Sequence, residues 1–214
     1  MKIGVLGTGN VAKVLSPKLI SLGHEVTLGS RDPGNSPGAK WAEENGAKAG
    51  TLAEAAASAD LVINTAPGLA SLDVLTAAGA ENLRGKVVID LSNGIESRDG
   101  VVAVATPNGG SIAEQLQSAF PDARIVKTLN TMAGQVMVDP GRIPGHHTVF
   151  VSGNDAAAKA EVADLLRSFG WTDAQILDIG DVVSARATEA ALLLFIRLFS
   201  TFQTPEFNLS VAKA

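Results

Sequence analysis

The stretch GVLGTGNVA, residues 4–12, decides the fold expected of this 214-residue chain. Read from Gly7, it has the pattern G-x-G-x-x-A, with an apolar run before it and an amphipathic segment after it. The first glycine of such a turn allows a tight bend, Gly9 lets a pyrophosphate approach the backbone, and Ala12 lets a helix pack closely on a strand. The phosphates then meet the N–H groups at the helix start. The residues predicted to hold a dinucleotide here are Gly7, Thr8, Gly9, Asn10 and Val11.

The stretch VTLGSRDPG, residues 26–34, follows at the distance where NAD-binding chains place an acid that binds the adenosine ribose. Ser30 and Arg31 stand there instead. An arginine at this place accommodates a 2′-phosphate, and a serine donates a further hydrogen bond. Asp32 leaves an alternative, because it could bind the ribose and favour NAD, or cap the next turn. We predict that the cofactor is NADP(H), held by Ser30 and Arg31.

Short β-type runs alternate with helical patterns along the rest of the chain. This alternation predicts an α/β fold, a Rossmann-type doubly wound parallel sheet with a small C-terminal extension ending in a long apolar helix. The expected strands are Lys2–Leu6, Glu25–Leu28, Leu61–Thr65, Val87–Leu91, Arg124–Thr128, Thr148–Ser152 and Ile176–Ile179, with a short extra strand at Ala47–Ala49. The expected helices are the segment from Val11 to Leu22, Gly38–Asn45, Leu52–Ala59, Ser71–Ala78, Ser111–Phe120, Asp155–Phe169 and Ala190–Phe202.

Two long loops, Asn93–Gly110 and Ala133–His147, are expected after strand ends, where ligands bind in open α/β sheets. We expect a division near Gly145. Residues 1–145 would form the NADP-binding Rossmann domain. Residues 146–214 would form a strand-helix-strand extension and a dimerisation helix.

Composition limits the other functions that the chain could have. Apolar residues make up 46% of the chain, charged residues 18%, and the net charge is −5, so the sequence offers no electrostatic basis for binding nucleic acid or a membrane. There is no cysteine, which excludes disulfides and thiolate metal sites, and we expect no bound metal. The opening MKIGVLG runs directly into a strand, so we expect a cytoplasmic protein.

The segment ALLLFIRLFSTFQ, which begins at Ala191, has hardly any polar face as a helix and is too short to span a bilayer. A helix that is apolar all round needs a partner on every side. We therefore predict a homodimer in which this helix and Phe207–Val211 pack across a two-fold axis. Just before it, Arg186 and Glu189 stand at i,i+3 spacing and are expected to pair with each other.

Several segments together resemble one known family. GVLGTGNVAKVLSPKLISLGHEVTLGSRDP, ADLVINTAP, KVVIDLSNG, RIVKTLNTM and DIGDVVSARATEAALLLFIRLF are similar to the NADPH-dependent coenzyme F420 reductases, also called F420-dependent NADP oxidoreductases. The cytosolic oxidoreductase domains of six-transmembrane metalloreductases carry similar stretches. The likeness covers nearly the whole chain. It implies an NADP-dependent oxidoreductase that transfers a hydride between NADPH and a flavin or a deazaflavin such as coenzyme F420.

The resemblance also implies which residues lie at the cofactor. Thr65, Ala66 and Pro67 would line the cofactor cleft. Asn130, Met132 and Ala133 would lie beside the nicotinamide ring and the small-molecule electron acceptor. No catalytic side chain is implied, because hydride transfer between stacked rings needs mainly positioning.

Two other functions stay open at this point. The first is a non-catalytic protein that senses NADPH by binding it. The second is a dehydrogenase or reductase of a small organic substrate, although about seventy residues after Gly145 are too few for the large helical domain of those enzymes.

Overall fold

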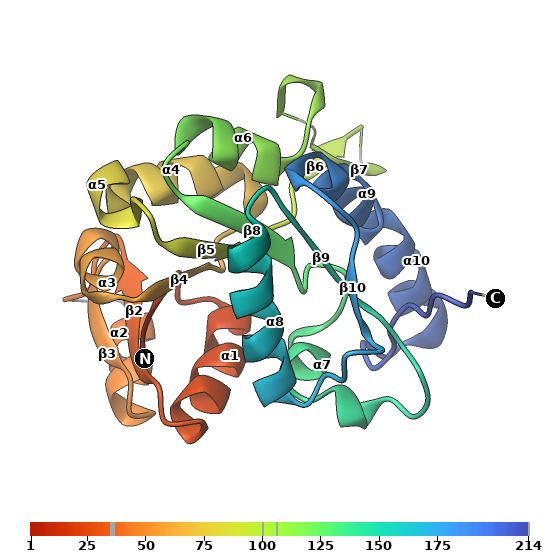
Figure 1. Cartoon of the computed structure of the whole chain (residues 1–214), viewed down its shortest axis with the longest axis horizontal. Helices are drawn as coiled ribbons and strands as arrows, with labels where there is room; N and C mark the ends of the chain where they lie inside the picture. Colours follow the sequence, from red (N-terminus) through yellow and green to blue (C-terminus); the bar gives the residue numbers. More distant parts are fainter. Residues whose placement is uncertain (35–36, 100, 106, 214) are drawn as a thin grey trace.

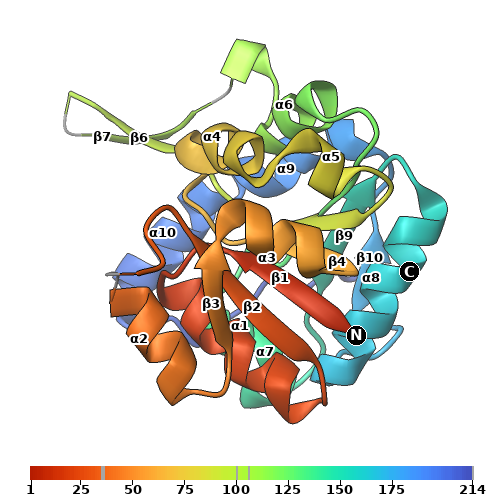
Figure 2. The ribbon, with the colours of Figure 1, turned by 90° about the vertical axis from the view of Figure 1, so that its left-hand side faces the viewer.

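An eight-stranded sheet runs through the computed structural model, which describes residues 1–34, 37–99, 101–105 and 107–213. Within these residues the strand order is β10-β9-β8-β5-β4-β1-β2-β3 (Figures 1 and 2). The strands of the sheet are β1 (Lys2–Leu6), β2 (Glu25–Ser30), β3 (Lys48–Thr51), β4 (Leu61–Asn64), β5 (Val87–Asp90), β8 (Arg124–Thr128), β9 (Val149–Gly153) and β10 (Ile176–Asp178). Because the chain steps outward from β1 to β3 and then returns to β4, the strand order reverses between β1 and β4.

Helices cover both faces of this sheet. The α-helices are α1 (Asn10–Ser21), α2 (Pro37–Glu44), α3 (Leu52–Ser58), α4 (Gly68–Ala78), α5 (Ala80–Leu83), α6 (Ile112–Ala119), α7 (Gly134–Val138), α8 (Ala156–Phe169), α9 (Ala185–Ala190) and α10 (Leu192–Phe202). Short 3-10 turns lie at η1 (Pro107–Gly109), η2 (Pro140–Arg142) and η3 (Val182–Ser184). The strands β4 and β5 are buried at every position, as expected of strands covered on both faces.

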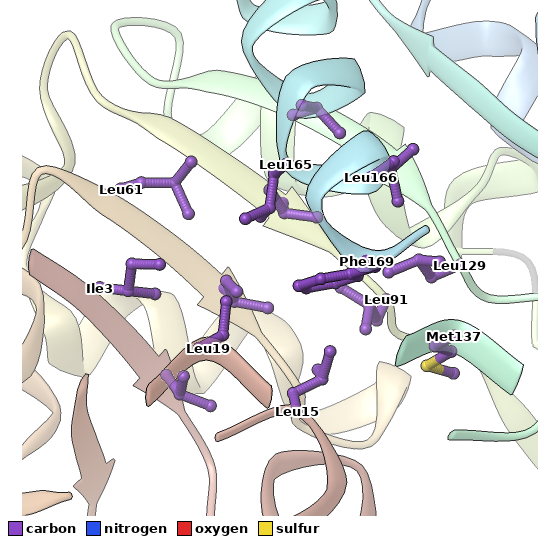
Figure 3. Packing of buried hydrophobic residues seen from close by; sticks show 14 of the residues in the cluster. Ile3, Leu15, Leu19, Leu61, Leu91, Leu129, Met137, Leu165, Leu166 and Phe169 are labelled. Atoms are coloured by element: carbon purple, nitrogen blue, oxygen red, sulfur yellow. The ribbon is translucent and has the colours of Figure 1, made fainter. Parts of the chain in front are cut away.

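Two apolar layers hold the helices on the sheet. On one face, Leu15 and Leu19 of α1 pack with Leu165 and Phe169 of α8 against the strands (Figure 3). On the other face, α3, α4 and α6 contribute a second cluster that includes Leu116. The doubly wound Rossmann-type fold predicted from the sequence is therefore confirmed.

The direction of the last two strands corrects one expectation. Six strands of the sheet are parallel, but β9 pairs antiparallel with β8, and β10 is parallel to β9. The segment between β8 and β9 holds only the short helices α7 and η2. A parallel connection needs a crossover of a dozen or more residues, usually a helix. The connection from Thr128 to Val149 is long enough, but it holds no helix longer than five-residue α7 to serve as the crossover, and β9 runs antiparallel to β8.

Both segments that the sequence indicated as loops contain regular structure. In the first loop, β6 (Ile95–Arg98) pairs antiparallel with β7 (Val101–Val104). Figure 2 shows this hairpin projecting from the body of the molecule. In the second, α7 packs against α1.

The C-terminal segment that follows α10 is bonded to Thr148, the residue before β9. The Thr148 N–H donates to the Leu209 carbonyl oxygen at 2.8 Å, and Asn208 Nδ2 donates to the Thr148 carbonyl oxygen at 3.0 Å. Along α10, Leu193, Leu194, Phe199 and Phe202 remain exposed by 41% to 53%. Among the described residues, no helix has the length and apolar character needed to cross a bilayer.

Candidate functional site

A cleft of about 790 Å³ lies at the carboxyl ends of β1, β2, β4 and β5, where the strand order reverses. Ligands of open α/β sheets bind at this place. The cleft brings together ten residues that the sequence indicated for cofactor binding. These are Gly7, Thr8, Gly9, Asn10, Val11, Ser30, Arg31, Thr65, Ala66 and Pro67.

The turn between β1 and α1 has the geometry of a phosphate-binding loop. Gly7 has φ 126°, and a Cβ added there would lie 2.7 Å from Thr65 Oγ1, so only glycine fits. A Cβ at Gly9 would meet nothing within 4 Å, because Gly9 faces the cleft. The start of α1 has no acidic residue in its first turn and no described side chain that caps it. Among the described residues, no side chain therefore caps the N–H groups of this helix start, and Asn10 and Val11 line the cleft, which suits an anion.

The end of β2 forms the second wall. The strand continues to Ser30, two residues beyond the predicted end, and places Ser30 and Arg31 at the cleft. Arg31 is exposed at the rim beside Asp32, which also lines the cleft. The guanidinium is therefore accessible to a phosphate that enters from solvent.

The turn after β4 is fixed by hydrogen bonds to its neighbours. Thr65 Oγ1 donates to the Leu6 carbonyl oxygen at 3.0 Å, and the Ala66 N–H donates to Asn64 Oδ1 at 3.2 Å. Asn64 is fully buried at the end of β4. The wall formed by Thr65, Ala66 and Pro67 is thus held from below by a buried amide.

Ser92 and Asn93 form part of the cleft surface, and they had not been assigned to the site from the sequence. The Ser92 side chain is buried, and its Oγ has no hydrogen-bond partner among the described residues. The signal that pointed to them was their place directly after a predicted strand. Ser92 and Asn93 share the cleft with the uncapped start of α1, so this turn would lie against a dinucleotide bound there.

The residues expected beside the nicotinamide, unlike the ten residues above, do not line the cleft. Asn130 does not line the cleft but pairs with Asn93, donating from Nδ2 to Asn93 Oδ1 at 2.9 Å and accepting from Asn93 Nδ2 at its backbone oxygen at 2.7 Å. Met132 is buried in the apolar core, and Ala133 precedes α7. The pair therefore connects Asn130 to the cleft indirectly.

A buried charged cluster lies beneath the Ser92 turn. Lys127 Nζ contacts Asp90 Oδ2 at 2.8 Å and Glu189 Oε1 at 2.8 Å, and it also donates to the Ser92 carbonyl oxygen. The side chains of Lys127 and Asp90 are fully buried, and that of Glu189 nearly so. We call Asp90, Lys127 and Glu189 the buried triad.

The partners of Glu189 correct the expected pairing with Arg186. Glu189 faces inward, where its carboxylate accepts from the N–H groups of Ile112 at 2.8 Å and Ala113 at 3.2 Å. Arg186 is exposed and pairs instead with Glu114, through bonds of 2.8 and 2.6 Å. The hydrogen bonds from Arg186, together with those from Ser111, lower the pKa of Glu114 to about 2.

No group of three or more His, Cys, Asp or Glu side chains among the described residues is arranged to hold a metal ion. The cleft is lined by the N–H groups at the start of α1, by Ser30 and by Arg31. These groups can bind phosphates and orient a nucleotide.

Comparison with known proteins gives consistent matches. The profile of the family described as NADP oxidoreductase coenzyme F420-dependent matches residues 2–94. A crystal structure described as a putative F420-dependent NADP-reductase from Arthrobacter sp. FB24 is 47% identical in sequence, covers 100% of both chains and superposes with a TM-score of 0.93. Curated relatives are metalloreductases: STEAP3 of Rattus norvegicus is 31% identical over 95% of this chain, and STEAP2 of Homo sapiens is 28% identical over 95%. The chain spans only 38% and 37% of the length of these two proteins.

Proposed function

Because the chain belongs to the family of coenzyme F420-dependent NADP oxidoreductases, we propose that it transfers a hydride between NADPH and a flavin or deazaflavin acceptor. Family membership makes it an NADP-dependent oxidoreductase, and the identity of the acceptor is the part that we propose. One observation carries the proposal. The uncapped start of α1 and the Ser30–Arg31 pair line one cleft at the carboxyl ends of the strands.

Each group of the cleft has a defined part in this proposal. The N–H groups of Asn10 and Val11 hold the pyrophosphate, and Gly9 lets it approach. Ser30 and Arg31 bind the 2′-phosphate. Bound NADPH would supply the hydride from its nicotinamide ring.

We place the nicotinamide at the side of the cleft formed by the turn after β5, which is bonded to the turn after β8 through Asn93 and Asn130. We propose that Ser92 and the Asn93–Asn130 pair orient the carboxamide side of the ring, with the backbone of Ala133 nearby. No acid or base is required of the chain for the transfer itself. Its part is to hold two rings in contact and to exclude water.

A panel of acceptors tests the proposal. NADPH oxidation is followed with FMN, FAD, coenzyme F420, a quinone and a ferric chelate, each also with NADH in place of NADPH. We expect turnover with a flavin or with coenzyme F420, and a clear preference for NADPH. Stoichiometric NADPH binding without oxidation by any acceptor would contradict hydride transfer and favour an NADPH sensor. Turnover only with the ferric chelate would contradict a flavin or deazaflavin acceptor and would favour a metal ion, as the name of the metalloreductase relatives suggests.

We also propose that a second copy of the chain covers α10. The exposed Leu193, Leu194, Phe199 and Phe202 form an apolar surface on one helix, and Phe207 of the following segment packs on Phe195 and Phe202 at ring centroid distances of 5.0 and 5.5 Å. Such a surface is larger than the isolated apolar residues common on monomers. The same apolar surface on a second copy could cover it across a two-fold axis, as in most homodimers.

Light scattering tests the dimer. The wild type should have twice the chain mass of 21.9 kDa at micromolar concentration. Phe199→Glu should give the mass of one chain, because a carboxylate would be buried at the interface. Leu22→Glu is a matched control, since Leu22 is an exposed leucine at the end of α1. A wild-type mass of one chain would refute the dimer.

A further inference from the structure

The buried triad connects three parts of the fold that are distant in the sequence. Asp90 ends β5 beneath the cleft, Lys127 lies on β8, and Glu189 belongs to α9. The ammonium of Lys127 has three donors, and they meet three acceptors: two carboxylates and the Ser92 carbonyl oxygen. The cluster is therefore closed, and no donor of Lys127 is left for another partner.

The upper side of the triad holds the floor of the cleft. Asp90 Oδ1 accepts from the Ser92 N–H at 3.1 Å and from Asn64 Nδ2 at 2.8 Å. Lys127 holds the carbonyl oxygen of the same Ser92. Both backbone groups of Ser92 are thus fixed by the triad, and Asn64 extends the network to the Ala66 N–H in the opposite wall.

The lower side of the triad holds the C-terminal helices. Glu189 is bonded to Lys127 and, through both carboxylate oxygens, to the first two N–H groups of α6. It belongs to α9, which is followed directly by α10. The position of α9 is therefore linked through one ammonium to the position of Ser92.

Buried ion pairs are weak evidence for stability, because well-packed apolar residues often stabilise a core equally well. The role of the triad is better explained by the positions of the backbone groups that it holds. Its hydrogen bonds converge on the backbone of a cleft residue and on the start of α6. We propose that Lys127 and Glu189 are positioning residues, which lock the Ser92 floor of the dinucleotide cleft to the C-terminal helices α9 and α10. This inference rests on the proposed binding of NADPH in the cleft.

The first test compares two variants of α9 for NADPH affinity. Glu189→Gln keeps the shape of the side chain but removes the charge that holds Lys127. We expect the dissociation constant for NADPH to rise about three- to ten-fold, because the floor loses a fixed support. Arg186→Gln is the matched control: it breaks the other link between α9 and α6, the exposed pair with Glu114, and should change affinity by less than about two-fold. Equal affinities for both variants and the wild type would contradict the proposal.

The second test uses the wild type, so that it holds even if Glu189→Gln does not fold. Amide hydrogen exchange is followed by NMR, residue by residue, with and without NADPH. We expect NADPH to slow exchange several-fold at Asn10 and Val11, which would contact it. It should also slow exchange at Ile112 and Ala113, whose N–H groups are held by Glu189 on the far side of the triad.

The exchange pattern separates the two ideas. Protection at both places supports the inference. Protection at Asn10 and Val11 without any change at Ile112 and Ala113 would overturn the positioning role and leave the proposed function intact. No protection anywhere, with no binding of NADPH by titration, would overturn the proposed function itself.

Discussion

The starts of α1 and α6 have opposite surroundings. The start of α1 carries no acid in its first turn and no described side-chain cap, and it faces the cleft. The start of α6 is saturated: Ser111 and Glu114 form a capping box, and Glu189 accepts from the next two N–H groups. Both helix starts carry the partial positive charge of aligned peptide dipoles.

The difference shows that the partial positive charge of a helix start can either anchor another part of the chain or bind a ligand. At α6 the chain supplies its own carboxylates, so the helix start anchors α9 and the buried triad. At α1 the chain supplies none, although a helix start favours an acid or a capping side chain. The helix start that lacks a cap follows Gly7 and Gly9, and Gly9 leaves room for a ligand to approach the backbone. We therefore infer that α1 leaves its N–H groups for the phosphates of a cofactor.

Among the variants that test this difference between α1 and α6, Gly9→Val should cause the largest loss of NADPH affinity. It places a branched side chain where the pyrophosphate would approach, so NADPH affinity should fall by more than about a hundred-fold. The fold should persist, because a Cβ at Gly9 meets nothing within 4 Å and φ there is −77°. Titration and circular dichroism measure both properties. Gly9→Ala serves as a graded control with a smaller loss, and wild-type affinity in folded Gly9→Val would place the phosphate elsewhere.

Arg31→Ala should have an intermediate effect. It removes a charge-assisted hydrogen bond to the 2′-phosphate, worth about 1.5–3 kcal/mol, so NADPH affinity should fall about ten- to a hundred-fold. NADH affinity should hardly change, because NADH lacks that phosphate. Arg84→Ala is the control, since Arg84 is an exposed arginine whose partner is Asp122. Equal losses of NADH and NADPH affinity would remove Arg31 from the 2′-phosphate site.

The smallest expected effect is the pH dependence of the stability that Glu114 contributes at the start of α6. The hydrogen bond from Arg186 is the main cause that lowers the pKa of Glu114 to about 2 from its ordinary 4.5. A carboxyl with a lowered pKa in the folded state stabilises it fully above the ordinary value, and the contribution is lost as pH falls from about 4.5 to about 2. The difference in urea midpoint between wild type and Glu114→Gln should therefore shrink across this window. A difference that stays constant from pH 5 to pH 2.5 would contradict the account.

Local patterns allowed much of the fold to be predicted. The glycine turn, the strand β1 and the helix α8 follow from residues that are neighbours in the sequence. The capping boxes at Thr51 and Ser111 are likewise local signals for the starts of α3 and α6. The short apolar runs of β4 and β5 are ambiguous when taken alone, and their regular alternation with helical patterns is what indicates strands.

Features that depend on distant contacts could not be predicted in this way. The connection between β8 and β9 lacks a long crossover helix, and β9 runs antiparallel to β8; composition does not reveal this direction. The inward turn of Glu189 depends on Lys127, 62 positions earlier in the printed sequence. The sequence pattern assigns no role to Ser92, because its place in the cleft is a property of the folded chain.

A crystal structure of the protein with NADPH tests the central claim most directly. The account predicts pyrophosphate oxygens about 2.7–3.2 Å from the backbone nitrogens of Asn10 and Val11, with the 2′-phosphate bonded to Arg31 and no phosphate at the start of α6. Phosphates bound away from the start of α1, or no bound nucleotide in crystals grown at saturating NADPH, would contradict it.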